Sequence, residues 1–184
     1  MADHITAEQE QTTLLRHVQN VWDGIRANSA IYRILLSDIR LVSATQGRVI
    51  AQLDIAPVHI NSKGIFHGSV SATIVDWAGG MAIAATGLEK TGVSTDIHVS
   101  YVSAAREGEI LEIEAWTTKV GRTLAYTQVE IRKTGKENGE NGPVVCTGSH
   151  VSSISDTLSV AFSVYLSTLL DRVSTSESVD LLSS

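Results

Sequence analysis

The chain has 184 residues, of which 43% are hydrophobic and 18% charged. This size supports one well-cored domain, and the apolar content argues against an intrinsically disordered chain. Its 14 Lys and Arg against 20 Asp and Glu give a formal charge of -6, which favours neither nucleic acid nor an anionic membrane as a partner. With Cys146 as the 1 cysteine, the chain forms no internal disulfide and suits a reducing compartment.

The first predicted element is an amphipathic helix near the N-terminus. Thr6 and Gln9 have the spacing of a capping box. Apolar residues then recur at helical spacing, at Leu14, Val18, Val21, Trp22 and Ile25. The first residues lack the pattern of a signal peptide and the arginine-rich character of a transit peptide. A cytoplasmic protein is therefore expected, with the mitochondrion as the alternative.

Strand-like alternation of apolar and polar residues follows this helix. Residues 39–44 and 48–55 predict a hairpin that turns at Thr45 to Gly47. Four further strands are predicted at residues 93–102, 110–120, 123–133 and 144–154. Because short turns join several of these strands in sequence, an antiparallel meander is expected.

Between the hairpin and the later strands lies a run of small and apolar residues that begins after His67 and ends near Gly87. A helix that is apolar on all sides is a buried helix. Asp76 is the single carboxylate in this run, and an ionised group in such surroundings needs a structural or chemical reason. Gly68 falls where the helix begins, so that unpaired backbone N–H groups can face an acceptor. The pair Gly79 and Gly80 predicts close packing against another helix or a ligand.

These elements together predict an α+β protein with a hotdog fold. An antiparallel β-sheet of five to six strands wraps around one long buried central helix, with extra N- and C-terminal helices. The expected divisions are an N-terminal helical segment at residues 1–34, a hotdog domain at 35–155, and a C-terminal helix with a flexible tail at 156–184. The last helix, starting near Leu158, is too short and too serine-rich to span a membrane, and we expect it to serve assembly or a partner contact.

The string Asn61-x-x-Gly64-x-x-His67-Gly68, with Asp76 on the helix and Ser94 opening the next strand, resembles the phenylacetate-pathway and acyl-CoA thioesterase 13 branch of hotdog-fold thioesterases. The likeness continues through residues 101–106 and 121–126. It covers about residues 39–153.

The resemblance implies catalytic roles for five residues. Asp76 would be the general base or nucleophile, and Asn61 would position the water or thioester across a dimer interface. The backbone N–H of Gly68 would polarise the thioester carbonyl, while His67 would orient or cap rather than act as a base, and Ser94 would assist secondarily. Asp76 as a purely structural carboxylate is the alternative. The chain departs from the family pattern at Ser69 and Trp77, which bear on the oxyanion site and on the acyl tunnel.

The resemblance also implies where coenzyme A would lie. The expected contacts are Tyr101, Val102, Ser103, Ala104, Ala105 and Arg106, then Lys119, Val120, Gly121, Arg122, Thr123 and Leu124, with Gly148 and His150 bordering the nucleotide. Arg106, Lys119 and Arg122 would meet phosphates, or would otherwise be solvated strand-end charges.

The function implied is hydrolysis of a fatty-acyl or aryl-acyl coenzyme A thioester in lipid metabolism. It needs no metal and no separate cofactor, since coenzyme A is part of the substrate. Release of an acyl or polyketide chain from a carrier protein, and a non-catalytic acyl-CoA-binding protein, are the alternatives. Because a single sheet leaves edges to protect, a homodimer is expected, with homotetramers as the further expectation.

Overall fold

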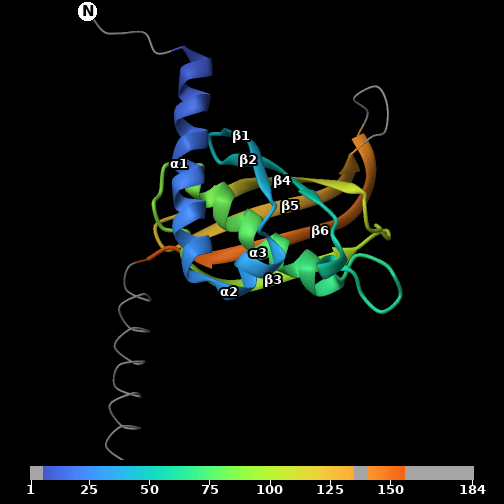
Figure 1. Ribbon diagram of the computed structural model, residues 1–184. Helices are drawn as coiled ribbons and strands as arrows, with labels where there is room; N and C mark the ends of the chain where they lie inside the picture. The colour runs from blue at the N-terminus through green and yellow to red at the C-terminus, as the bar shows by residue number, and fades with distance from the viewer. Residues whose placement is uncertain (1–5, 135–140, 156–184) are drawn as a thin grey trace, which may run out of the picture.

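The computed structural model describes residues 6–134 and 141–155 (Figure 1). Its helices and strands, in chain order, are α1 (Ala7–Asn28), α2 (Ala30–Leu35), β1 (Arg40–Thr45), β2 (Arg48–Asp54), the short 3-10 helix η1 (Pro57–His59), α3 (Gly68–Ala84), β3 (Val93–Tyr101), β4 (Ile110–Val120), β5 (Leu124–Thr134) and β6 (Asn141–Ser153). All six predicted strands and the predicted central helix are confirmed within one or a few residues. The predicted C-terminal helix lies outside the described residues.

The six strands form one antiparallel sheet in the order β1-β2-β4-β5-β6-β3. β4, β5 and β6, which follow one another in the chain, form the expected antiparallel meander. β3 instead lies at the sheet edge, where it pairs with β6. The reason is the helix: α3 connects β2 to β3 across the whole sheet, so β3 arrives at the far edge rather than beside β2.

Helix α3 lies against one face of the curved sheet (Figure 1) and contacts β2, β3, β4, β5 and β6. Its sequence explains this position, because twelve of its seventeen residues are buried and no continuous polar stripe exists. This arrangement is the predicted hotdog architecture. Asp76 is one of the residues of α3 that are not buried, and its side chain keeps 30% of its exposure.

Two consecutive glycines allow α3 to pack closely against the sheet and against the loop that connects α3 to β3. A Cβ atom on Gly79 would lie 2.3 Å from Nδ1 of His150 and 2.7 Å from Oγ1 of Thr127. On Gly80 it would lie 3.3 Å from Cβ of Thr91. The glycines therefore do mark close packing, but the neighbours are strand and loop residues rather than another helix.

The N-terminal helices cover one end of the sheet and helix. The predicted capping box of Thr6 and Gln9 is present, and α1 packs on β1 and α3. Trp22 is 1% exposed and contacts Trp77 of α3 edge to face, with ring centroids 5.4 Å apart. The short helix α2 was not predicted as a separate element; Ser29 caps it by accepting a hydrogen bond from the backbone N–H of Tyr32.

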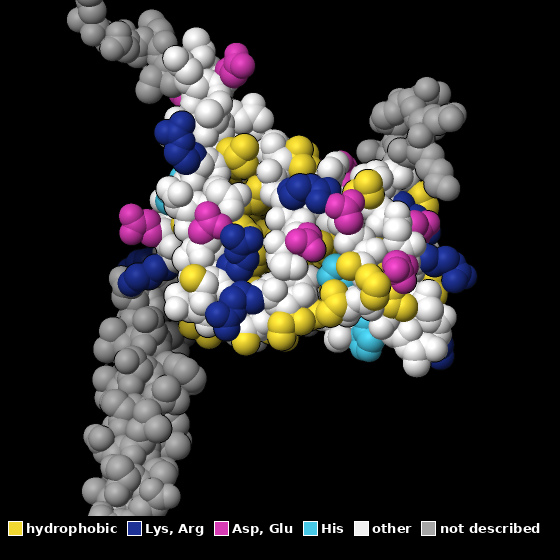
Figure 2. All heavy atoms as spheres, in the orientation of Figure 1, with side chains coloured by type: hydrophobic (Ala, Val, Ile, Leu, Met, Phe, Trp, Pro, Cys, Tyr) yellow, Lys and Arg dark blue, Asp and Glu magenta, His cyan; other side chains and the backbone are white. Residues whose placement is uncertain are grey.

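Charged side chains of both signs are interspersed over the face of the molecule in Figure 2, without a continuous basic patch on that face. This distribution agrees with the negative formal charge. Within the described residues, no helix is both long and apolar enough to cross a membrane. Cys146 is buried on β6, and burial raises the pKa of its thiol to about 11, so the thiol stays protonated at neutral pH.

Candidate active site

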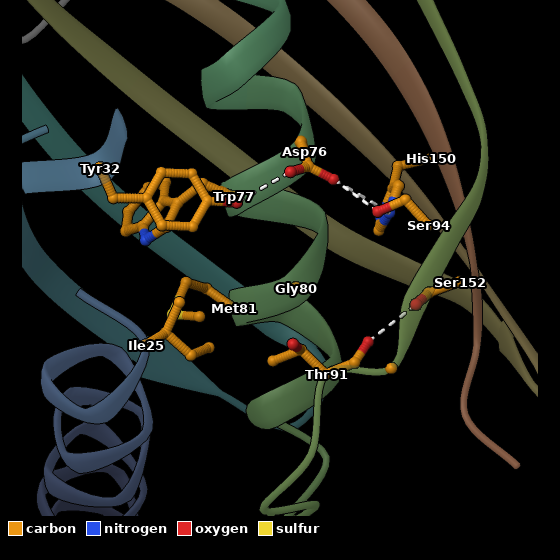
Figure 3. A pocket seen from close by; sticks show the side chains of 11 residues that line it. Ile25, Tyr32, Asp76, Trp77, Gly80, Met81, Thr91, Ser94, His150 and Ser152 are labelled. Atoms are coloured by element: carbon orange, nitrogen blue, oxygen red, sulfur yellow. Dashed lines mark hydrogen bonds and ion pairs between the residues drawn. The ribbon is translucent and has the colours of Figure 1, made fainter. Parts of the chain in front are cut away.

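The carboxylate of Asp76 is the centre of a small polar cluster (Figure 3). Its Oδ1 atom accepts a hydrogen bond of 2.6 Å from the Ser94 hydroxyl, which belongs to β3. Its Oδ2 atom accepts one of 2.8 Å from the hydroxyl of Tyr32, which belongs to α2. A carboxylate has about four lone-pair positions, so two remain to meet a water molecule or a substrate.

His150 of β6 lies behind Ser94. Its Nε2 atom is 2.9 Å from the Ser94 hydroxyl oxygen and 3.6 Å from Oδ1 of Asp76. Because the Ser94 hydroxyl donates to Asp76, the Nε2 atom must carry the proton and donate to Ser94. Its Nδ1 atom has no partner within residues 6–134 and 141–155 and lies against Gly79. The imidazole is therefore the neutral Nε2–H tautomer.

This chain of hydrogen bonds differs from a nucleophilic Ser-His-Asp triad. In a triad the imidazole lies between the serine and the carboxylate and accepts the serine proton. Here the serine lies between the other two groups, and its proton points to Asp76. Ser94 is therefore a hydrogen-bond donor to Asp76 and is not activated by the imidazole.

Burial of His150 lowers the pKa of its imidazole, while the negative charges of Asp76 and Asp96 act in the opposite direction. The side chain is 2% exposed, and desolvation is the larger effect. At neutral pH the imidazole is neutral and keeps the proton on Nε2 that the Ser94 contact requires.

This lowered pKa predicts a pH-dependent stability. The unfolded chain binds the His150 proton near the ordinary pKa of about 6.5, and the folded chain binds it only at lower pH. The contribution is therefore present above about pH 6.5 and is lost as the pH falls from there through the folded pKa. Urea unfolding between pH 7.5 and 5 should give a flatter pH dependence in His150→Gln than in the wild type, by at most about 1.4 kcal/mol per pH unit. Equal slopes in both proteins would contradict the assignment.

A cavity of about 220 Å³ opens beside the Asp76 carboxylate. One side is polar and includes Ser94, His150 and Ser152, whereas the opposite side is apolar and includes Ile25 and Met81. The indole of Trp77 also lines the cavity but is itself 2% exposed, because it packs against Trp22. A cavity with a carboxylate on one side and an apolar wall on the other suits a substrate that combines a polar group with an apolar chain.

Asn61 and Gly68 lie in a second, separate cavity of about 360 Å³. Residues Tyr101 to Ala104 line the same cavity. The side-chain oxygen of Asn61 accepts hydrogen bonds from the backbone N–H groups of Lys63 and Ile65, at 2.9 and 3.3 Å. Asn61 therefore shapes the loop that leads into α3. Within one chain, the structure brings Asn61 together with Gly68 but not with Asp76.

Gly68 is the first residue of α3, and its N–H has no hydrogen-bond partner in the part of the chain that the structure describes. His67 caps the helix: its Nδ1 atom accepts from the backbone N–H of Ser69 at 3.1 Å and lies 2.8 Å from the Ser69 hydroxyl. The capping role expected for His67 thus matches the geometry. The Ser69 side chain is tied back to His67, so the unpaired donor at the helix N-terminus is the Gly68 amide.

The residues expected to contact coenzyme A fall into two groups. Tyr101 lies opposite Cys146 of β6, whereas the turn before Leu124 lies near the other end of β6, where Leu124 pairs with Ser153. Since a strand rises about 3.3 Å per residue, the two groups are roughly 20 Å apart or more in one chain. The single chain does not bring them together, although Arg106, Lys119 and Arg122 are all exposed.

Three other residues of that expected set are buried. Ala105 is 0% exposed, and its carbonyl accepts a hydrogen bond from the backbone N–H of Phe66. Gly148 packs so closely on Val75 that a Cβ atom would lie 2.7 Å away. His150 faces Ser94 instead of the surface. These placements differ from the expected ones beside coenzyme A.

Tyr32 is the site residue that sequence reasoning missed, and His150 was expected at the nucleotide instead. A sequence signal for Tyr32 existed, because Ser29 precedes a short apolar segment and is a good helix N-cap. No local signal could have placed either side chain beside Asp76, because both contacts span long stretches of the chain.

Comparisons with known proteins identify the family of this chain. The family model described as "Thioesterase superfamily" matches residues 63–140. Human acyl-coenzyme A thioesterase 13 is 36% identical over 120 residues, which are 65% of this chain and 82% of that protein. The zebra fish thioesterase superfamily member 2 structure is 31% identical with a TM-score of 0.66, and the match covers 77% of this chain and 98% of that one.

The fold also recurs at lower identity. A hypothetical thioesterase of Streptococcus pneumoniae, solved with coenzyme A, is 22% identical with a TM-score of 0.57, and the match covers 65% of this chain and 87% of that one. The family model, the relatives above 30% identity and the hotdog architecture all lead to one assignment. The chain is a thioester hydrolase that belongs to the thioesterase superfamily, in the hotdog-fold branch that includes acyl-coenzyme A thioesterase 13.

Proposed function

We propose that this protein hydrolyses acyl-coenzyme A thioesters to a free acid and coenzyme A, with Asp76 as the general base. The observation that carries the proposal is the Asp76 carboxylate, held by Ser94 and Tyr32 at the edge of a cavity with an apolar wall. A carboxylate with free lone pairs can take a proton from water as the water attacks the thioester carbonyl. The name of the human relative, acyl-coenzyme A thioesterase 13, supports the choice of substrate.

Hydrolysis also needs a donor for the oxyanion that forms on the carbonyl oxygen. The Gly68 amide is such a donor, because it lies at the positive end of α3 and has no partner among the residues that the structure describes. It lies in the second cavity, with Asn61, rather than beside the Asp76 carboxylate. The proposed reaction therefore needs two chains, each supplying one half of the site.

The position of β3 supports this two-chain site. β3 is an edge strand of nine residues, all of them exposed except the partly buried Val99. Such edges favour pairing with another strand. Ser94 marks the Asp76 cavity near one end of β3, and Tyr101 marks the Gly68 cavity at the other. Antiparallel pairing about a two-fold axis at Ile97, the middle of β3, would bring the Asp76 cavity beside the partner's Gly68 cavity.

The same pairing would rejoin the coenzyme A contacts. In one chain the segment from Tyr101 to Arg106 and the turn from Lys119 to Leu124 lie toward opposite ends of β6. A two-fold axis through β3 places the two chains in opposite directions. The segment 101–106 of one chain then comes near the turn 119–124 of its partner. The exposed Arg106, Lys119 and Arg122 would then supply cations to the phosphates of coenzyme A.

The proposal is tested by measuring free-thiol release from acetyl, medium-chain, long-chain and aryl coenzyme A thioesters with the wild-type protein. Turnover of at least one of them is expected, and the preferred chain shows what the cavity beside Asp76 accepts. The same acyl groups are then offered on a phosphopantetheine carrier protein. Hydrolysis of carrier-bound thioesters alone would overturn the coenzyme A assignment in favour of chain release from a carrier.

A further inference from the structure

Tyr32 is one of the two residues whose hydroxyl groups bind the Asp76 carboxylate. It comes from α2, outside the segment that the family model matches. Its hydroxyl donates to Oδ2 of Asp76, while Ser94 donates to Oδ1. One carboxylate oxygen thus binds a donor from α2 and the other binds a donor from β3. The two hydrogen bonds together fix the rotation of the carboxylate group about its Cβ–Cγ bond.

The phenol ring is held by packing. Tyr32 contacts Trp22 edge to face with ring centroids 5.6 Å apart, and Trp22 in turn contacts Trp77, the residue next to Asp76. Both indoles are almost fully buried. A hydroxyl on a ring that is fixed in this way costs little side-chain entropy when it donates to Asp76.

The hydroxyl also keeps its proton. Burial raises the pKa of the Tyr32 phenol, and the charge of Asp76 and the hydrogen bond to it raise that pKa further. Tyr32 is therefore a donor throughout the pH range in which the enzyme would operate, and it does not serve as a proton source for the leaving thiolate.

We propose that Tyr32 is a positioning residue that binds Oδ2 of Asp76 and so presents Oδ1, with Ser94, to the attacking water. This inference rests on the proposed function, since it assigns the geometry of that general base. It makes the N-terminal helices part of the active site, because α1 holds Trp22 and α2 carries the hydroxyl.

The test is the Tyr32→Phe variant, which keeps the ring on Trp22 and removes the donor. With the best coenzyme A thioester, kcat/KM should fall roughly tenfold, the effect of losing a hydrogen bond to a charged group. The acid limb of the rate–pH profile should move to higher pH, because the ionised carboxylate has lost a stabilising donor. Tyr126→Phe, at an exposed tyrosine on β5, is the matched control and should leave both rate and profile unchanged.

A stronger donor gives the opposite shift. Incorporation of 3-fluorotyrosine at position 32 makes the phenol more acidic, so the acid limb should move to lower pH. Because this variant keeps the hydroxyl, it can replace Tyr32→Phe in the test if Tyr32→Phe does not fold. An unchanged pH profile in either folded variant, even with a lower unfolding temperature, would overturn the positioning role. Full activity of Asp76→Asn would instead overturn the proposed function on which the role depends.

Discussion

Asp76→Asn should lose about 100- to 10,000-fold in kcat, the contribution of a general base. The amide keeps the shape of the carboxylate and can still accept from Ser94 or Tyr32, so the fold should remain. It cannot take a proton from water at neutral pH, so the loss of the general base appears in kcat. Free-thiol release under saturating thioester measures the loss directly.

The control for this experiment is Asp23→Asn on α1. Asp23 is half exposed, pairs with Arg26 on the helix surface and does not line the cavity beside Asp76. The Asp23→Asn substitution also removes one negative charge. It should retain wild-type activity, because a surface ion pair contributes little to stability. If Asp76→Asn and Asp23→Asn both hydrolyse at the wild-type rate, Asp76 is a structural carboxylate and the general base lies elsewhere.

Local sequence patterns predicted most of the helices and strands. β4, predicted at residues 110–120, is observed as Ile110–Val120, because strand alternation is a local property that the turn at Gly121 terminates. Helix α3 was equally visible, since its apolar residues leave no polar stripe. The strand order was not predictable in the same way. The pairing of β3 with β6 depends on contacts between residues about fifty positions apart, which no turn signal records.

Some residues of the candidate site could likewise be recognised from the sequence, whereas others are placed there only by tertiary packing. Asp76 was identified because it is the single carboxylate of an apolar helix, whereas Ser94 was identified only through the resemblance to a known family. Tyr32 and His150 reach Asp76 only through the packing of α2 and the register of β6. The expected burial of Asp76 was overestimated for the opposite reason: the helix around it is buried, but its own side chain faces a cavity.

Gly68→Pro should lower kcat by about 100- to 1,000-fold, the effect of losing one oxyanion donor. Proline removes the backbone N–H while suiting the first position of a helix. His67, the preceding residue, already has φ of -74° and ψ of 130°, the extended conformation that a following proline requires. The substitution should therefore delete the donor without breaking α3.

Gly68→Ala separates the donor from the volume of the side chain. Its Cβ atom would lie 3.2 Å from the ring of Tyr101, a close contact that proline shares, but alanine keeps the N–H. Most of the activity should remain in Gly68→Ala and be lost in Gly68→Pro, as measured by kcat with the preferred thioester. Equal losses in the two variants would assign the effect to crowding at Tyr101 and not to an oxyanion donor.

Mixing the two inactive variants then tests whether the site is shared between chains. In a dimer of one Asp76→Asn chain and one Gly68→Pro chain, one composite site carries both substitutions and the other carries neither. Random exchange makes about half of the dimers mixed, so unfolding and refolding an equal mixture should restore about a quarter of the wild-type activity. If each site were built within one chain, every site would carry one substitution. The mixture would then remain as inactive as its components, and the pairing of β3 across a two-fold axis would lose its functional role.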